Sequence, residues 1–321
     1  MHLGVFNPVL SHLSLEESLK YLSGLGIKWL ELGCGGYPGT AHADAKVLSR
    51  DTKKRTELKD TFEKYGMSIA ALSVHGNAVH PDPAVAAPFE ADFRAACELA
   101  GQLGVERVVT FSGCPGDGES KYPNWVTCAW PPDYARILQY QWEDVLVPYW
   151  KSASKFAADS GVKKICLELH PGFCVYNPET MLRLRREAGN IMHANFDPSH
   201  LFWQGIDPVE AIKYLGDAIG FFHAKDTEMN THQVERTGVL DTRPYTDELN
   251  RSWIFRTVGY GHGALDWKRM ISALRLIGYD HVVSIEHEDS LMTPKEGLEK
   301  AVAFLQPLLI TDSAKVDVWW A

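Results

Sequence analysis

Short apolar runs alternate with longer amphipathic segments from one end of this 321-residue chain to the other. A short apolar run rich in β-branched and aromatic residues predicts a buried strand, and an amphipathic segment predicts a helix that covers it. The predicted strands are residues 3–7, 29–33, 69–75, 107–112, 164–170, 193–197, 220–225 and 282–288. The predicted helices are residues 15–22, 53–65, 89–103, 141–160, 178–187, 208–215, 267–277 and 294–308. Eight such units predict an α/β fold, a single (β/α)8 TIM barrel over residues 1–321.

Three connections are long enough to need an explanation of their own, namely residues 37–49 after the second predicted strand and two longer ones. Residues 114–134 follow the fourth predicted strand and are rich in Pro, Gly and Trp, and residues 227–263 follow the seventh. Both are expected as insertions on the active face, as lids or substrate walls, with a packing insert or a subunit contact as the alternative. Residues 309–321 form a C-terminal tail whose apolar end, VDVWWA, is expected to pack on the barrel or on a partner subunit.

Four polar residues stand at the ends of four consecutive predicted strands: Glu168, Asp197, His223 and Glu286. The C-terminal ends of barrel strands meet at one face, where the chemistry of this fold is found. Carboxylates and imidazoles are costly to bury without partners. Three carboxylates and one imidazole suit one divalent cation, Mn²⁺ first, with Co²⁺, Zn²⁺ and Mg²⁺ as alternatives. The competing interpretation is a salt-bridged barrel core without metal.

A candidate base lies beside the first of these residues. Residues i and i+2 of a strand face the same side, so Glu168 and His170 of LELHP are both expected at the barrel mouth. The ordinary pKa of histidine, near 6.5, suits a base at neutral pH. A metal that polarises a carbonyl would let such a base take the adjacent proton, and the resulting enediolate would isomerise, epimerise or eliminate a β-substituent. The alternative for His170 is a hydrogen bond in the outer shell or a helix cap.

Composition argues against several classes of protein. The net charge of −9 argues against nucleic-acid binding, which depends on Lys and Arg. No apolar run approaches the roughly 18 residues of a membrane span, and no basic, apolar leader precedes the first strand. The six cysteines show no CxxC spacing, so we expect reduced thiols in a cytoplasmic protein.

The motifs LELHP, NFDPSH, FFHAKD and GYGHGALDW, in this order, resemble the sugar phosphate isomerase/epimerase superfamily of xylose-isomerase-like TIM barrels. The resemblance implies one divalent metal held by Glu168, Asp197, His223 and Glu286, with the two glutamates also serving as an acid/base pair. It further implies that His200, three residues after the aspartate, orients the substrate.

Other residues near the mouth are expected to bind substrate. Lys225 comes two residues after His223. The epimerases usually carry an arginine a few residues past this histidine, and here Lys225 offers a hydrogen-bond donor to a substrate oxygen. His75 and Glu31 end the third and second strands, and Trp203 offers a flat ring to the C–H face of a sugar. Ordinary polar bonding or core packing is the alternative for each of these three.

The resemblance leaves three activities to weigh. The first is a metal-dependent enzyme that abstracts a proton next to the carbonyl of a sugar, cyclitol or keto-sugar, as an isomerase or epimerase. The second is a lyase that dehydrates an inosose or cleaves a 3-oxo-glycoside, as in the large subunit of C-glycoside deglycosidases, which works with a small partner subunit. The third and least favoured is an endonuclease-IV-like phosphodiesterase, because Phe111, Ser112 and Gly113 stand where that class has a zinc-binding histidine. The expected partners are a carbohydrate or glycoside and either further copies of this chain or a small second subunit.

Overall fold

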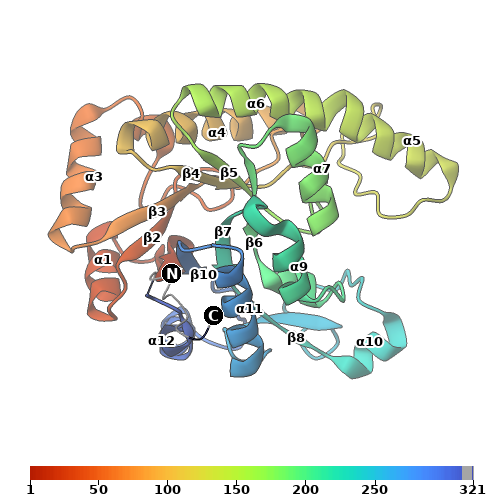
Figure 1. The fold of residues 1–321 in the computed structure, drawn as a ribbon. Helices are drawn as coiled ribbons and strands as arrows, with labels where there is room; N and C mark the ends of the chain where they lie inside the picture. Colours follow the sequence, from red (N-terminus) through yellow and green to blue (C-terminus); the bar gives the residue numbers. More distant parts are fainter. Residues whose placement is uncertain (313–319, 321) are drawn as a thin grey trace.

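The computed structural model describes residues 1–312 and Trp320. Eight parallel strands close into a barrel in the order β1-β10-β7-β6-β5-β4-β3-β2 (Figure 1). The strands are β1 (His2–Phe6), β2 (Trp29–Gly33), β3 (Ser68–Ser73), β4 (Arg107–Thr110), β5 (Lys164–Glu168), β6 (Met192–Phe196), β7 (Ile219–Ala224) and β10 (Val282–Ile285). The predicted (β/α)8 barrel is confirmed. The packing expected of VDVWWA lies, apart from Trp320, outside the described residues.

Helices surround the barrel and connect its strands (Figure 1). The longer ones are α1 (Leu15–Gly24), α3 (Thr52–Lys64), α4 (Pro83–Leu103), α6 (Val147–Asp159), α7 (Pro178–Ala188), α9 (Pro208–Leu215), α11 (Ala264–Leu276) and α12 (Pro294–Leu305). Local sequence explains their ends: α1 begins at a capping box of Ser14 and Glu17, and α4 ends at Gly104, whose φ of 74° suits glycine. Within the described part of the chain, none of the helices has the length and apolar character needed to cross a membrane.

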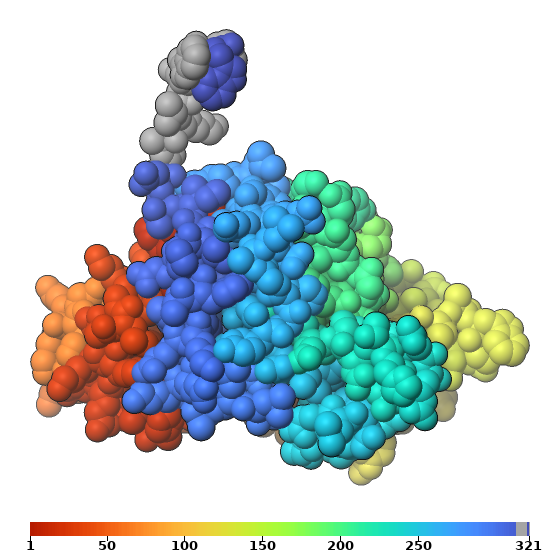
Figure 2. Space-filling model, turned by 90° about the horizontal axis from the view of Figure 1, so that it is seen from below, coloured from red at the N-terminus to blue at the C-terminus, as the bar shows by residue number. Residues whose placement is uncertain are grey.

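The predicted helix 141–160 begins earlier than expected. In the structure α5 (Pro132–Tyr140) runs through a π-helical turn, η2 (Gln141–Leu146), into α6. Pro132 at the first helical position starts α5, which buries none of its residues and projects from the barrel (Figures 1 and 2). The sequence analysis placed residues 114–134 in a long connection and began the helix at residue 141, so α5 was not predicted.

Inside the barrel, alternate residues of the strands form two layers. The lower layer is an apolar plug of Ala70, Ala71, Val109, Cys166, Phe221 and Val282. Two residues further along β2, β3, β7 and β10, the upper layer holds Glu31, Ser73, His223 and Ser284, all fully buried. The floor of the barrel mouth is therefore polar, and the plug beneath it closes the interior.

The second of the two longer connections contains a β-hairpin with its own small core. Strands β8 (Asp226–Met229) and β9 (Trp253–Arg256) pair antiparallel, and α10 (Thr231–Thr237) lies between them in the sequence. Trp253 stacks on Trp203 with ring centroids 4.9 Å apart and planes within 5°, and Phe255 joins them. Trp203 is carried by the segment after α8 (Pro198–Phe202), so this stack attaches the hairpin to the barrel.

Asp226 ties the end of this insertion to the barrel. Its Oδ2 accepts hydrogen bonds from the backbone N–H groups of Gly259, Gly261 and His262 at 3.0–3.2 Å. Its Oδ1 accepts from the backbone N–H of Thr227 at 2.8 Å. Gly261 has no room for a side chain, because a Cβ there would lie 2.2 Å from the Thr227 carbonyl oxygen. The GYGHG sequence is thus a backbone cradle for one buried carboxylate.

We predict that Asp226→Asn lowers the free energy of unfolding by on the order of 3 kcal/mol, because an amide N–H₂ would face donors in a buried site. Chemical denaturation of chelator-treated protein would measure this. The control is Asp51→Ala, which removes the exposed N-cap of α3 and should cost about 1 kcal/mol. Equal losses in the two variants would contradict the role given to Asp226.

Candidate active site

The strands end before several of the polar residues that the sequence placed at their ends. The predicted strands 164–170 and 282–288 stop at Glu168 and Ile285, so His170 and Glu286 lie in the loops that follow. The His170 N–H donates to the Glu168 carbonyl at 2.9 Å, which is a tight turn and not an extended strand. The alternation argument for Glu168 and His170 was therefore wrong about the backbone, although both side chains do reach the mouth.

Glu168, Asp197, His223 and Glu286 come together at the barrel mouth. One donor atom from each lies within 4.8 Å of the others. Asp197 also begins α8, since its Oδ1 accepts from the Ser199 N–H at 2.8 Å. That bond turns its second oxygen, Oδ2, toward the cluster. The structure thus gathers in one place the four residues predicted from the sequence as metal ligands.

His223 is held in one orientation by Glu31. Its Nε2 donates to Glu31 Oε2 at 2.8 Å, and the carboxylate also accepts from Ser73 Oγ at 2.5 Å and Ser284 Oγ at 2.7 Å. Phe6 stacks on the imidazole with ring centroids 5.4 Å apart. Nδ1 faces the cluster and lies 3.0 Å from Glu286 Oε2. Against the effect of burial, Glu31 and Glu286 raise the pKa of His223 well above its ordinary value, so Nδ1 becomes a lone-pair donor when a bound cation displaces its proton. A metal-binding histidine commonly donates its other N–H to a carboxylate in this way.

Three atoms of the cluster are buried without a hydrogen bond: Asp197 Oδ2, His223 Nδ1 and Glu286 Oε2. Buried polar atoms of folded proteins almost always have a partner, so such atoms require an explanation. Each belongs to a different member of the four-residue set, and all are lone-pair donors to a cation. The residues present therefore fit a divalent metal, which they would hold through three oxygens and one nitrogen.

Lys225 is the alternative cation for this cluster. It is 2% exposed, and its Nζ lies 3.1 Å from Asp197 Oδ2, 2.9 Å from Glu286 Oε2 and 3.1 Å from Glu288 Oε2. Burial opposes the charge of Glu286, but Lys225 and His223 outweigh it and lower the pKa of Glu286 to about 2. Burial raises the pKa of Asp197 to about 7 in spite of Lys225. One ammonium thus leaves part of the negative charge uncompensated.

Two more histidines contact Glu168. His75 Nε2 lies 3.0 Å from Glu168 Oε2, and His200 Nε2 lies 3.0 Å from Oε1. Burial opposes ionisation of Glu168, but contacts with His200, His223 and His75 hold its pKa well below the ordinary value. Burial, with His170 nearby, lowers the pKa of His200 to about 3, so His200 is a neutral donor to Glu168.

His170 stands at the edge of the site with one nitrogen free for chemistry. Its Nδ1 lies 2.6 Å from the Pro171 carbonyl oxygen, so Nδ1 carries the proton and Nε2 the lone pair. Burial lowers the pKa of His170, which keeps the ring neutral. Its ring lies 4.1 Å from that of His200, and donor atoms of Glu168, His170 and His200 form a second group within 4.8 Å.

A cavity of about 170 Å³, called here the metal cavity, opens over the cluster. Its walls are Phe6, Pro8, Tyr37, Pro38, His75, Phe111, Glu168, His170, Lys225, Glu286 and Glu288. His75 and Lys225, both predicted to bind substrate, line it. Glu288 and the aromatic rings of Phe6, Tyr37 and Phe111 were not predicted as site residues. Strand periodicity carried a signal for Glu288 alone, two residues after Glu286.

The other three residues predicted to bind substrate lie elsewhere. Glu31 is fully buried in the floor and positions His223, and His200 contacts Glu168. Trp203 belongs to the core of the hairpin. None of the three is among the described residues that line the metal cavity, so we assign them positioning and packing roles instead.

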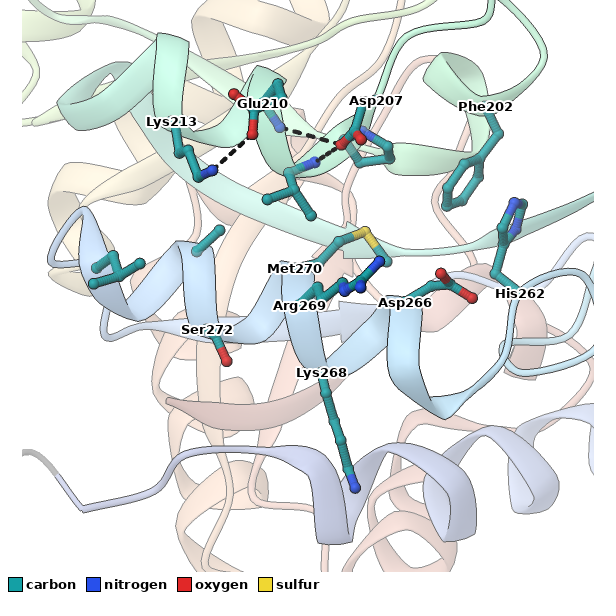
Figure 3. Close-up of a pocket in the computed structure, with 14 residues that line it drawn as sticks. Phe202, Asp207, Glu210, Lys213, His262, Asp266, Lys268, Arg269, Met270 and Ser272 are labelled. Atoms are coloured by element: carbon teal, nitrogen blue, oxygen red, sulfur yellow. Dashed lines mark hydrogen bonds and ion pairs between the residues drawn. The ribbon is translucent and has the colours of Figure 1, made fainter.

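A larger groove, of about 540 Å³, lies between α9 and α11 on the outside of the barrel (Figure 3). Its charged residues mostly serve the helices: Asp207 caps α9, and Lys213 pairs with Glu210 at 2.6 Å. His262 stacks on Phe202 with ring centroids 3.5 Å apart. Among the described residues it shares no wall with the metal cavity, and we assign it no catalytic role.

We predict that chelator-treated protein binds about one Mn²⁺ per chain in calorimetric titration. Glu286→Gln removes a donor, and Glu31→Gln weakens the hold on His223, so each should lower Mn²⁺ affinity, the latter by about 10–100-fold. Glu296→Gln, an exposed glutamate on α12, is the matched control. Two ions per chain would show that Glu168, His170 and His200 also bind metal. No binding to the wild type would favour the salt-bridged cluster around Lys225.

Comparison with known proteins supports the family resemblance that the motifs indicated. The chain is 40% identical over 310 residues to the uncharacterized protein YfiH of Bacillus subtilis (strain 168), which covers 95% of this chain and 98% of YfiH. It is 28% identical over 154 residues to the inosose dehydratase of Geobacillus kaustophilus (strain HTA426), 48% of this chain and 47% of that enzyme. The crystal structure of IOLI protein with a binding zinc atom superposes with a TM-score of 0.67 at 21% identity, over 96% of this chain and 98% of that one.

The family model described as xylose isomerase-like TIM barrel matches residues 19–308, from the first helix to the last. That span contains the closed barrel apart from β1, and it contains all four residues of the cluster. The chain therefore belongs to the xylose isomerase-like TIM barrel family and to the sugar phosphate isomerase/epimerase superfamily that its motifs indicated.

Proposed function

We propose that this protein is a divalent-metal-dependent enzyme that abstracts a proton next to the carbonyl of a sugar, cyclitol or keto-sugar. The observation that carries the proposal is the composition of the metal cavity. One small space is bounded by two carboxylates of the four-residue cluster, Glu168 and Glu286, by the ammonium of Lys225 and by neutral His170. Proton abstraction from carbon needs these parts, namely a base and positive charge beside the oxygen that becomes negative.

The base in this proposal is His170. Its Nε2 lone pair is available because Nδ1–H is engaged by the Pro171 carbonyl. A substrate carbon in the metal cavity would give up its proton to Nε2, and the electron pair of that C–H bond would move to the carbonyl to form an enediolate. A metal bound by the cluster would polarise the carbonyl and make the adjacent C–H more acidic.

Lys225 supplies positive charge to the same oxygen. Its ammonium is kept charged because Asp197, Glu286 and Glu288 surround it, and these carboxylates raise its pKa well above the ordinary value against the effect of burial. Phe6 and Phe111 cover the cavity walls and exclude water from the developing charge. The proton on His170 then returns to carbon, or Glu286 or Glu168 first takes a proton from a substrate hydroxyl or from water and delivers it to the other face of the carbon.

Where the proton returns decides the reaction. Return to the neighbouring carbon gives an isomer and return to the other face gives an epimer, and this outcome is our first choice because the family is named for an isomerase. The half-chain relation to an inosose dehydratase favours the second candidate, in which the enediolate loses a β-substituent as water or as the aglycone of a 3-oxo-glycoside. His170, which lines the cavity with Glu288 and holds the abstracted proton, would then pass that proton to the leaving group.

The test is proton exchange in deuterated water. Mn²⁺-loaded wild type is expected to place deuterium at the carbon next to the carbonyl of at least one member of a panel of ketohexoses, inososes and 3-oxo-glycosides, measured by mass spectrometry. His170→Gln should slow this exchange by about 100-fold or more. His232→Gln, an exposed histidine on α10, is the matched control. Equal exchange by wild type and His170→Gln would exclude His170 as the base.

The products separate the two candidates. An epimer or isomer that carries one deuterium supports reprotonation, whereas a dehydrated product or a free aglycone supports elimination. Absence of exchange across the whole panel would contradict the proposed function.

A further inference from the structure

We propose that the substrate carries a planar apolar group beside its reacting sugar, and that this group lies against a wall formed by Tyr245 and Phe255 of the inserted hairpin. The inference rests on the proposed function and names the kind of substrate that the site accepts. It concerns a second cavity of about 430 Å³, called here the hairpin cavity, lined by His170, Tyr245, Ile254, Phe255, Glu288 and Ser290.

The two cavities meet at shared residues. His170 and Glu288 line both the metal cavity and the hairpin cavity. The metal cavity alone, at about 170 Å³, is smaller than the roughly 300–1,000 Å³ of ordinary small-molecule sites. Together the two spaces fall within that range. A ligand whose reacting carbon lies at His170 therefore has its continuation in the hairpin cavity.

The charged groups become fewer from one cavity to the next. The metal cavity sets three aromatic rings beside carboxylates, an ammonium and imidazoles, whereas the hairpin cavity joins two aromatic rings and Ile254 to one carboxylate and one imidazole. Its polar groups, those of His170, Glu288, Ser290 and the Tyr245 hydroxyl, are few for the many hydroxyls of a second sugar. A polar head joined to a flat apolar group matches this change of surface.

The aromatic wall is fixed in place before any ligand binds. Tyr245 stacks on Phe255 with ring centroids 5.7 Å apart and planes within 17°. Arg251, which is 2% exposed, lies 4.3 Å from the Tyr245 ring and donates from Nε to the Trp253 carbonyl at 3.1 Å. Tyr245 nevertheless keeps 55% of its surface exposed. A large ring that is held by neighbouring side chains and still open to solvent is a preorganised surface for a ligand.

Phe255 connects this wall to the reacting groups. Lys225 Nζ lies 4.8 Å from its ring centroid, and the His200 ring meets it edge-on at 5.5 Å. The same side chain thus packs against the cluster on one side and supports Tyr245 on the other. A group bound on the wall would be placed next to the sugar in the metal cavity.

The test titrates phenol, as the probe, into the metal-free full chain and measures its binding by saturation-transfer NMR. Saturable binding to the wild type is expected, weakened about fivefold or more in Tyr245→Ala because the ring it would contact is lost. Tyr245→Phe keeps the ring and should keep the binding. Tyr122→Ala, an exposed tyrosine in the loop after β4, is the matched control. Thermal unfolding confirms that each variant is folded.

Three results would overturn the proposal. These are no saturable phenol binding by the wild type, equal binding by Tyr245→Ala, and Tyr245-dependent binding of methyl β-D-glucopyranoside in place of phenol, which would assign the wall to a second sugar. The same titration with Mn²⁺ added separates this inference from the proposed function. Faster relaxation of bound phenol would place the ring near the metal. Phenol binding without any effect of Mn²⁺ would count against the metal site and still support the aromatic wall.

Discussion

The rest of the site depends on the concentration of negative charge at the barrel mouth. Glu168, Asp197 and Glu286 are removed from water in a space where one lysine reaches only part of their charge. The burial of these charges lowers the stability of the fold. It is tolerated because histidines donate to Glu168, because Asp197 accepts the N–H of Ser199 as the N-cap of α8, and because the polar floor rests on the apolar plug. The atoms left without a hydrogen bond are those a cation would need.

The barrel and the membership of its four-residue cluster could be predicted from the sequence for a physical reason. Buried parallel strands are apolar throughout, so a carboxylate or imidazole at the end of such a run stands out, as Glu168 and His223 do. The fold then brings strand ends together whatever the loops do. The position of Asp197 was also readable, because Asp-Pro is a common start of a helix.

What the sequence could not show were contacts set by loops and by packing between distant segments. Glu31 lies at a strand end like Glu168 and His223, yet its partner is Nε2 of His223, the nitrogen that faces away from the cluster, and the barrel register rather than the local sequence pattern sets this contact. Trp203 reads equally well as a sugar platform or as core, and only the stack with Trp253 decides. Tyr245 lies in a polar stretch without periodicity, so nothing local marks it as a wall of the site.

The carboxylate of Asp226 has a consequence for how this chain could diversify. It follows Lys225 directly, and the backbone that it gathers, Gly259 to His262, is the point where the insertion returns to the barrel. The hydrogen bonds of Asp226 therefore hold the two ends of the hairpin segment together next to Lys225. Phe255 between them contacts Lys225 and His200, so the residues free to be lengthened, shortened or exchanged are those outside the aromatic core of the hairpin. The insertion can therefore vary in length and sequence while the polar floor of the barrel stays the same.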